Sequence, residues 1–275
     1  MNKYGSLTIF QIIPLIFFGS CSIIEGPIEY SNPLDPNDPN FEPPGVNFIQ
    51  GPTEAEIVDT CVVTFEWDGN YSGMSYSFRI DTEEWSEWSN LHLVEYPLLD
   101  EGPHHFEVKS RYFSGVESDD SQVVSFVVDD LKGTALAVFP RYSRISQAED
   151  VEVEIIVHDV TDLAIIKVVL NYNPTRLTVN SVQVYEGTSF LAANGGTVIP
   201  FYSIDTVQGN ITIDVAVATG SPNGVSGSGG IARINFTSIS SQPSSIDFEI
   251  SSEFRDADNT TIQIGDFGNG GVYAE

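Results

Sequence analysis

The chain has 275 residues, which is enough for two domains of ordinary size and too long for one small module. Its 11 Lys and Arg stand against 39 Asp and Glu, a formal net charge of −28 that disfavours nucleic acid and anionic membrane surfaces as direct partners, because both bind through cations. With 41% hydrophobic and 11% aromatic residues, the chain can still bury a core.

The first 20 residues predict a signal peptide. One cation, Lys3, precedes a mostly apolar run over 7–18, which is shorter than the roughly 20 apolar residues of a membrane span. The residues Phe18-Gly19-Ser20-Cys21 resemble a bacterial lipobox, and this resemblance implies lipidation of Cys21. We therefore expect an exported, membrane-anchored lipoprotein at the outer membrane or cell surface. The alternative is an ordinary secretory signal with Cys21 as a spare thiol.

Residues 21–45 predict a linker. The stretch 22–45 holds six prolines and five acidic residues without an apolar period of a strand or helix. Repeated X-Pro steps favour an extended, polyproline-like tether. Calcium binding by Asp35 and Asp38 is an alternative, although two carboxylates are few for an ion that takes about six to eight oxygens.

From Val46 onward the chain reads as short β-rich runs broken by Gly, Asn, Asp, Ser and Pro, which is typical of β-sandwiches. A boundary near residues 129–134 separates two apolar runs and divides this part into 46–130 and 131–275. The first part holds 3 Lys and Arg against 18 Asp and Glu, and the second holds 7 against 16. We expect an all-β protein with two sandwich domains.

The first domain shows two-residue alternation, with Cys61, Val63, Phe65 and Trp67 on one face of a strand. Residues 46–130 resemble the fibronectin type III-like and triple-tyrosine modules of bacterial exported proteins. The stretch Trp85-Ser-Glu-Trp88-Ser also matches the W-S-x-W-S motif of cytokine receptors, but those carry it near the last strand, so we interpret it as an aromatic-rich hairpin. Trp85 and Trp88 either stack on sugars or pack at a strand edge.

The second domain carries three segments that match one family in order. They are Leu170-Asn-Tyr-Asn-Pro-Thr-Arg-Leu177, the strand within 209–220, and Gly230-Ile-Ala-Arg-Ile-Asn-Phe236. In these segments, residues 131–275 resemble the cohesin domain of cellulosome scaffoldins and its non-cellulosomal relatives. The resemblance implies a nine-stranded jelly-roll sandwich that binds dockerins, which are small calcium-loaded helical modules, through the outer face of one sheet.

Alternation on two strands predicts which side chains that outer face would present. The expected protein-binding residues are Ile165, Lys167, Val169, Asn171, Thr212, Asp214 and Ala216. Inward neighbours would be Ile166, Val168 and Leu170. An alternative is that this face packs against the other domain. We expect no cofactor or metal in the chain itself, with calcium entering only through a dockerin-type partner.

Motifs of catalysis are not evident in the sequence. The four histidines, at 92, 104, 105 and 158, have no recognisable nucleophile setting, and no metalloprotease, nucleophile-elbow or phosphate-loop pattern occurs. The loop at Asp256 starts like a calcium loop but has Thr261 where Gly is needed. The sequence therefore predicts a non-catalytic envelope lipoprotein that docks a dockerin-bearing or similar exported protein. The alternative function is polysaccharide binding by the sandwiches.

Overall fold

The computed structural model describes residues 31–187, 189–218 and 224–274, so the signal peptide and Cys21 lie outside the described residues. The chain divides into two units, one ending at Glu42 and one running over 43–275. Among the described residues, no helix is both long and apolar enough to cross a membrane.

The described part of the first unit is folded into turns rather than extended. The amide N–H groups of Asp35, Asp38 and Phe41 each donate to the carbonyl three residues earlier. The two aspartates reinforce these turns, because Asp35 Oδ1 accepts from the Asn37 N–H at 2.9 Å and Asp38 Oδ1 accepts from the Asn40 N–H at 2.8 Å. The Asn40 and Asn32 amides lower the pKa of Asp38. The expectation of an extended backbone is therefore wrong here, since Asp-Pro-Asn repeats favour local side-chain turns.

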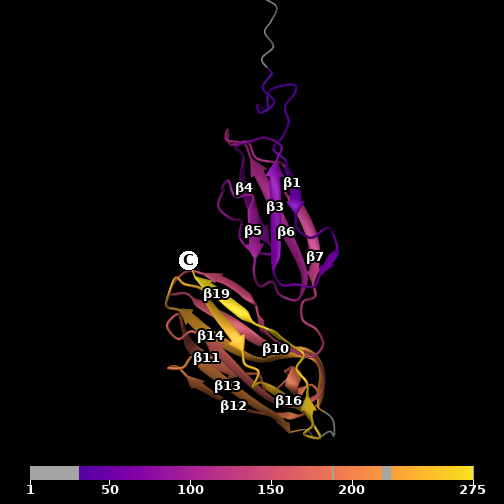
Figure 1. Ribbon diagram of the computed structural model, residues 1–275, viewed down its shortest axis with the longest axis vertical. Helices are drawn as coiled ribbons and strands as arrows, with labels where there is room; N and C mark the ends of the chain where they lie inside the picture. The colour runs from indigo at the N-terminus through magenta and orange to yellow at the C-terminus, as the bar shows by residue number, and fades with distance from the viewer. Residues whose placement is uncertain (1–30, 188, 219–223, 275) are drawn as a thin grey trace, which may run out of the picture. The chain divides into compact units, whose positions relative to one another are not determined.

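Seven strands of the second unit form two sheets between Val46 and Val128 (Figure 1). A three-stranded sheet has the order β1-β3-β5, and a four-stranded sheet has the order β2-β7-β6-β4. The strands are β1 (Val46–Gln50), β2 (Glu56–Val58), β3 (Val63–Gly69), β4 (Ser75–Ile80), β5 (Leu93–Tyr96), β6 (Gly102–Arg111) and β7 (Gln122–Val128).

Aromatic side chains fill the space between these two sheets. Phe65 on β3 stacks on Phe106 of β6 with ring centroids 3.9 Å apart, and Trp67 lies 5.8 Å from the same ring. Phe65, Trp67, Phe106 and Phe126 are almost wholly buried. The predicted inward face of the β3 segment is therefore observed, and it packs strands of one sheet on strands of the other.

The remaining strands, from Ala135 to Ala274, form one large curled sheet of twelve strands. Its longest path is β11-β14-β10-β15-β19-β9. The elements are β8 (Ala135–Phe139), β9 (Tyr142–Ile145), β10 (Asp150–Tyr172), β11 (Leu177–Val184), the short 3-10 helix η1 (Phe190–Ala192), β12 (Thr197–Asp205), β13 (Asn210–Ala218), β14 (Val225–Ser238), β15 (Ser244–Phe248), β16 (Glu253–Asp256), β17 (Thr261–Ile262), β18 (Asp266–Gly268) and β19 (Gly270–Ala274).

The fold is therefore all-β, as the sequence predicts. The sheet has twelve strands rather than the expected nine because β16, β17 and β18 are separate short segments. Its curled layers enclose one apolar core that contains the predicted inward residues Ile166, Val168 and Leu170.

Strand β10 belongs to both layers of this sheet. Its first half pairs with β8 and β14, and its second half pairs with β13, β15 and β16. Register shifts near Asp159 and Asp162 separate the halves, and both residues have positive φ. The Asp159 N–H donates to Ser228 Oγ at 2.9 Å and the Asp162 N–H donates to Ser226 Oγ at 3.0 Å, so neighbouring hydroxyls satisfy the bulged backbone.

The antiparallel pairing of β10 with β13 fixes which side chains point outward. Ile166, Val168 and Leu170 lie opposite Val215, Ile213 and Ile211, and all six are buried. The turn before β13 needs Gly209, whose φ is +73° and where a Cβ atom would collide with the Tyr172 carbonyl. The outward positions of both strands are thereby set in register with one another.

Candidate functional site

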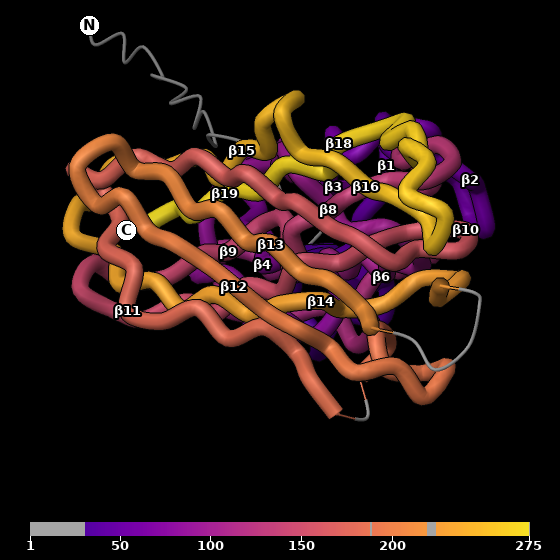
Figure 2. The backbone as a smooth tube through the Cα atoms, turned by 90° about the horizontal axis from the view of Figure 1, so that it is seen from below, coloured from indigo at the N-terminus to yellow at the C-terminus, as the bar shows by residue number. Residues whose placement is uncertain are grey.

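Four neighbouring strands, β12, β13, β10 and β16, present one continuous outer surface. β12 and β13 run side by side, as Figure 2 shows, and β13 and β16 both pair with the second half of β10. Two rows of outward side chains cross these strands in register. The first row is Ile199, Ala216, Ile165 and Arg255, and the second is Phe201, Asp214, Lys167 and Glu253. We call these eight residues the docking face.

The docking face has an apolar part that water reaches. The exposed fractions are 67% for Phe201, 41% for Ile199 and 39% for Ile165. In the first row the half-buried Ala216 lies between Ile199 and Ile165, and in the second row the exposed Asp214 lies beside Phe201. A small residue between two larger apolar ones leaves a shallow apolar stripe across the sheet.

Charged side chains border this stripe. Lys167 on β10 lies opposite Asp214 of β13 and Glu253 of β16 in the strand register. The Arg255 guanidinium forms an ion pair with the Glu253 carboxylate. Two cations and two anions therefore stand beside the apolar row, an apolar centre with a polar rim of the kind found in protein interfaces.

Other predicted contact residues are less available than Ile165 and Lys167. Thr212 and Asn171 are half-buried. The Asn171 amide is engaged on both sides, because its Nδ2 donates to Glu249 Oε1 at 2.5 Å and its Oδ1 accepts from Asn210 Nδ2 at 3.0 Å. Asn171 therefore orders the end of the face rather than presenting an unpaired amide.

Val169 is the predicted site residue that the structure contradicts. Only 7% of it is exposed, although it points away from the core residues Val168 and Leu170. The turn between β15 and β16 runs alongside it: the Glu249 N–H donates to the Val169 carbonyl at 2.8 Å, and the Val169 N–H donates to Ser252 Oγ at 3.0 Å. Val169 consequently supports the sheet and does not contribute to the docking face.

Sequence reasoning missed the residues supplied by β12 and β16. Ile199 and Phe201 alternate with Val198, and that period of two was a usable signal for an exposed face. Their place beside Ala216 and Asp214 depends on the pairing of β12 with β13, which alternation alone does not give. Glu253 and Arg255 join the face only through the pairing of β16 with β10.

The two candidate sugar-stacking tryptophans form a ladder with cations in the first sandwich. Arg79 and Lys109 lie over the Trp85 ring at 4.6 and 4.7 Å from its centroid, and Lys109 and Arg111 lie over the Trp88 ring at 5.0 and 4.3 Å. Arg79 on β4 pairs with Glu107 on β6, and Lys109 and Arg111 follow Glu107 at two-residue intervals, so the three cations form one line. Trp85 lies beside the first two of these cations, and Trp88 lies beside the last two. A sugar would have to displace a cation to stack on either ring.

A buried His–Asp pair in the same sandwich lacks the features of a catalytic dyad. His104 Nδ1 lies 2.7 Å from Asp81 Oδ2, and its Nε2 lies 2.8 Å from the Asp100 carbonyl oxygen. Both contacted atoms are hydrogen-bond acceptors of the fold itself, so each ring nitrogen is already engaged and neither faces a substrate. Within the described ranges, no three His, Cys, Asp or Glu side chains are grouped as a metal site would require.

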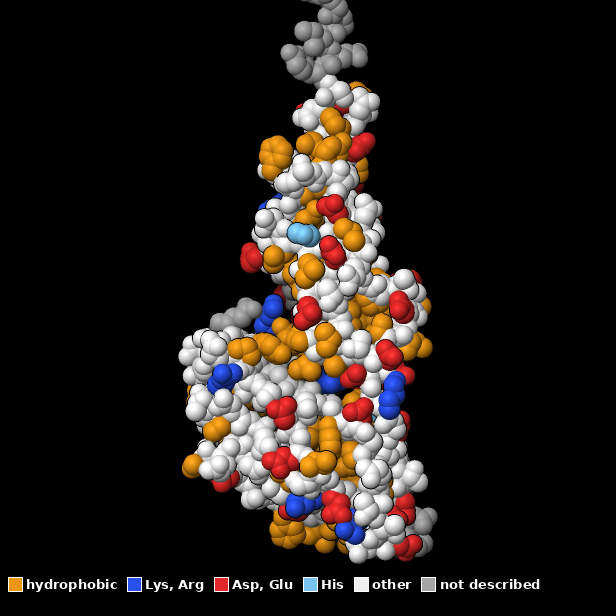
Figure 3. Space-filling model, in the orientation of Figure 1, with side chains coloured by type: hydrophobic (Ala, Val, Ile, Leu, Met, Phe, Trp, Pro, Cys, Tyr) orange, Lys and Arg blue, Asp and Glu red, His pale blue; other side chains and the backbone are white. Residues whose placement is uncertain are grey.

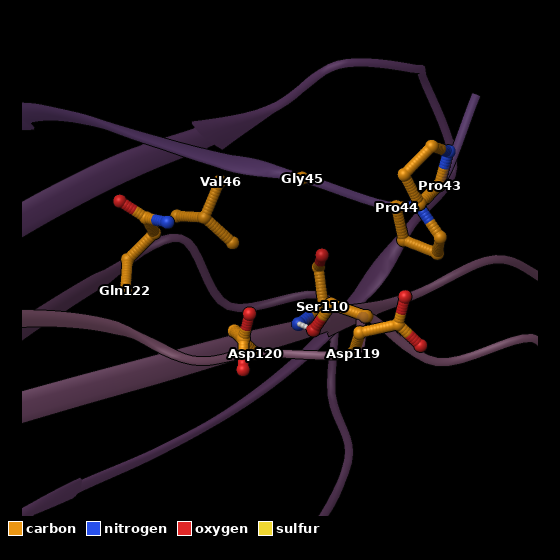
Figure 4. A pocket seen from close by; sticks show the side chains of 9 residues that line it. Pro43, Pro44, Gly45, Val46, Ser110, Asp119, Asp120 and Gln122 are labelled. Atoms are coloured by element: carbon orange, nitrogen blue, oxygen red, sulfur yellow. Dashed lines mark hydrogen bonds between the residues drawn. The ribbon is translucent and has the colours of Figure 1, made fainter.

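A small hollow of about 220 Å³ lies where the chain enters the first sandwich (Figure 4). Pro43 and Pro44 line one side, and Ser110, Asp119 and Asp120 line the other. The two carboxylates are fewer oxygen ligands than calcium takes, and the loop at Asp119 is exposed. The hollow therefore does not have the make-up of a calcium site.

No protein-family model matches the chain, and no curated protein matches its sequence. Half of the chain is similar to solved cohesin structures. A non-cellulosomal cohesin from Archaeoglobus fulgidus is 18% identical, with 51% of this chain and 90% of that chain covered and a TM-score of 0.41. A type I cohesin–dockerin complex from Clostridium thermocellum is 18% identical, with 52% and 95% covered and a TM-score of 0.41.

A cohesin from Acetivibrio cellulolyticus scaffoldin B, solved with a mutant Cel5 dockerin, is 16% identical. The similarity covers 52% of this chain and 100% of that one, with a TM-score of 0.41. These identities and scores describe a likeness over half the chain and assign no partner to it.

Proposed function

We propose that the second sandwich docks a helical, dockerin-like module of another exported protein on the docking face. The observation that carries this proposal is the group of exposed apolar side chains on one sheet, Ile199 and Ile165 of the first row and Phe201 of the second, which we call the apolar row from here on. Large apolar side chains gathered on a surface cost solvation free energy, and patches rimmed by polar groups mark protein contact sites.

A helix with one apolar stripe suits this face. Ile199 and Ile165 lie in the same row on two strands with β13 between them, so their side chains are spaced across the sheet by about two strand separations, or roughly 10 Å. That distance matches two turns of a helix, over which apolar residues recur on one side. The charged pairs around Lys167 and Arg255 would fix the orientation of such a helix.

The chain lacks the features of an enzyme in the part described, and we propose that it acts by binding alone. The ladder tryptophans are stacked with cations, and the buried His104 is held by two acceptors. The outward side chains of the docking face are not gathered around a deep cavity. Holding a partner needs only such a surface.

Binding to calcium-loaded dockerin modules encoded in the same genome tests the docking proposal. Ile165→Asp places a carboxylate in the apolar row, and we expect it to weaken capture by about 30-fold or more, as for a residue central to an interface. Ile239→Asp is the matched control, because Ile239 is similarly exposed but follows β14 and lies outside the docking face. Equal binding by wild type and Ile165→Asp, or no binding to any module, contradicts the proposal.

We further propose that the mature protein is held at the cell envelope by a lipid on Cys21. The cysteine follows a signal-peptide-like segment and two small residues. Two or more acyl chains, at about 0.8 kcal/mol per buried methylene, would hold it on a membrane stably. Cys21→Ser should move the protein from the membrane fraction to the soluble exported fraction. Unchanged fractionation would argue against lipidation.

A further inference from the structure

We propose that the hollow where the chain enters the first sandwich binds a primary ammonium group on an alkyl stem. The hollow lies between Val46, at the start of β1, and Ser110, near the end of β6, and so between the two sheets. Ser110 continues the inward series of Phe106 and Val108 on β6. Gln122 pairs opposite Val108 and therefore shares that inward side. The polar groups of the hollow thus face the space between the sheets.

The Ser110 hydroxyl is a polar group of the hollow that lacks a partner. Ser110 is wholly buried, and its Oγ has no hydrogen-bond partner in the part of the chain that the structure describes. Figure 4 shows the Ser110 side chain directed into the hollow, toward the segment that carries Gly45 and Val46. An unpaired buried hydroxyl is destabilising, so a ligand that hydrogen-bonds to it removes that cost on binding.

Hydrogen bonds hold both walls of the hollow in place. On one side, Asn70 Nδ2 donates to the Pro43 carbonyl at 2.9 Å, and the Gly45 N–H donates to Asn70 Oδ1 at 3.1 Å. On the other side, the Ser118 N–H donates to the Ser110 carbonyl at 2.8 Å, and the Ser110 N–H donates to Ser118 Oγ at 3.2 Å. The walls are therefore fixed before a ligand arrives, which lowers the ordering cost of binding.

The charges at the hollow favour a cation. Asp119 and Asp120 lie at its border, and none of the described residues that line it is Lys or Arg. The stretch 46–130 holds 18 acidic residues against 3 cations, and Figure 3 shows acidic side chains spread over the face in view. Arg111 is adjacent in sequence, but the alternation of β6 turns it to the outer side, where it lies over the Trp88 ring. Anionic ligands would therefore be repelled.

An alkylammonium group fits the remaining features of the hollow. It has three donors and no acceptor, and it can donate to the Ser110 hydroxyl, the Gln122 amide oxygen and the aspartate carboxylates. Pro43, Pro44 and Val46 provide apolar walls for its methylene groups. The volume of about 220 Å³ is below the roughly 300–1,000 Å³ of a typical ligand pocket, so the hollow takes one group of side-chain size.

Two kinds of molecule carry such a group, namely a protein with a lysine side chain and a free alkyl amine. N-acetyl-lysine methylamide represents the first, and n-butylamine represents the second. Tighter binding of the lysine derivative assigns the hollow to a partner protein, because the backbone amides then add contacts. Equal or tighter binding of n-butylamine assigns it to a free amine.

Amide signals of the full chain, labelled with nitrogen-15, measure binding at neutral pH, where both amines are charged. We expect both amines to shift the amide signals of Gly45, Ser110 and Ser118 in a saturable manner at millimolar concentration. N-acetyl-norleucine methylamide, which has a similar side chain without the amino group, should leave these signals in place.

Ser110→Ala tests the hydroxyl without disturbing the fold, because it removes an unpaired polar atom and keeps a small side chain. We expect the affinity for either amine to fall by about tenfold, since a hydrogen bond to a charged group is lost. The melting temperature should stay the same or rise, because no hydrogen bond within the protein is lost. Ser143→Ala, at another buried hydroxyl without a partner among the described residues, is the matched control on β9.

Asp120→Asn tests the charge at the border of the hollow. We expect it to weaken amine binding by about two- to fivefold, as for an exposed ion pair. Asp59→Asn, at an exposed carboxylate that does not line the hollow, should leave the affinity unchanged. Phe201→Ala should bind both amines as wild type does, which separates this proposal from the docking proposal.

Three outcomes would overturn the inference. One is the absence of a saturable shift with either amine, which would mean that the hollow holds only water. Another is an equal response to the norleucine derivative, because charge would then not select the ligand. The third is an equal loss of affinity in Asp120→Asn and Asp59→Asn, which would mean that the net charge of the protein attracts the amine without a site at the hollow.

Discussion

Two outer sheet faces of this protein carry large aromatic or aliphatic side chains, and they differ in how much of each side chain is already covered. On the docking face, Phe201 and Ile165 stand beside small or charged neighbours and remain exposed. On the ladder, Trp85 and Trp88 are stacked with Arg79, Lys109 and Arg111. The difference is in what already contacts each ring.

This comparison shows that an aromatic motif is insufficient evidence of a binding surface. The W-S-x-W-S stretch is the more conspicuous pattern in the sequence, yet its rings are used within the fold. The Ser86 N–H donates to the Phe78 carbonyl at 2.9 Å, and the Ser77 hydroxyl donates to the Ser86 carbonyl at 2.7 Å, so the motif is hydrogen-bonded to β4. Its tryptophans then cover the outer side of β4 and β6.

The largest expected effect is the loss of partner binding when the docking face is truncated. Phe201→Ala removes the most exposed ring of the apolar row and should weaken module binding by about 30-fold or more. It should leave thermal unfolding nearly unchanged, because the ring is mostly outside the core. Calorimetric titration and thermal melts of the same samples measure both. If Trp85→Ala weakens module binding as much, the contrast between the faces fails.

A smaller effect is expected in the ladder, where the loss appears in stability. Lys109→Met removes the cation shared by both indoles and should lower the free energy of unfolding of the first sandwich by about 1–2 kcal/mol. Urea unfolding followed by tryptophan fluorescence measures it, since all three tryptophans lie in this sandwich. Lys132→Met, at an exposed ion pair with Asp129, is the control. An unchanged urea midpoint for Lys109→Met would show that the hydrogen bonds between Ser86 and β4 keep the two indole rings in place without the shared cation.

Local alternation predicted much of the second sandwich correctly. Ile166, Val168 and Leu170 point into the core, and Ile165 and Lys167 point out, because a strand inverts its side chains at every residue whatever lies beside it. The same rule worked for the β3 segment of the first sandwich. The direction of each side chain is a property of a single strand, so a short stretch of sequence is enough to predict it.

The failures concern contacts between distant segments. Val169 follows the alternation but is buried by a turn that lies far along the chain. Ile199 and Phe201 join the docking face through strand pairing. The register shifts of β10 at Asp159 and Asp162 are accompanied by hydrogen bonds to the hydroxyls of Ser226 and Ser228, which lie more than 60 residues along the chain. Which strands become neighbours is set by the packing of the whole sheet.

The buried His104 pair should make the stability of the first sandwich depend on pH. Burial alone lowers the pKa of His104, but the hydrogen bonds to Asp81 and to the Asp100 carbonyl outweigh it, so the pKa is raised above 6.5. The stabilisation is therefore complete below the unfolded-state pKa of about 6.5 and is lost as the pH rises through the folded-state pKa.

Urea midpoints of the first sandwich measured from just below pH 6.5 upward check this sign, using tryptophan fluorescence. Burial also raises the pKa values of the Asp100 and Glu83 carboxyl groups, so a histidine variant is needed to separate the imidazole from them. His104→Gln should flatten the profile, whereas His105→Gln, at an exposed ring beside Ser125, should not. Midpoints that increase with pH in wild type would mean that the neutral imidazole is the more stable form.

The smallest effect is expected from the charged rim of the docking face. Lys167 is exposed and lies between Asp214 and Glu253, so its interaction with a partner is screened by water and salt. Lys167→Met should change module affinity by about two- to fivefold and reduce its dependence on ionic strength, mainly through the association rate. Kinetic binding measurements at low and high salt, with Lys132→Met as control, resolve this. A loss as large as that of Phe201→Ala would instead place Lys167 at the desolvated centre of the interface, and the apolar row would then be its rim.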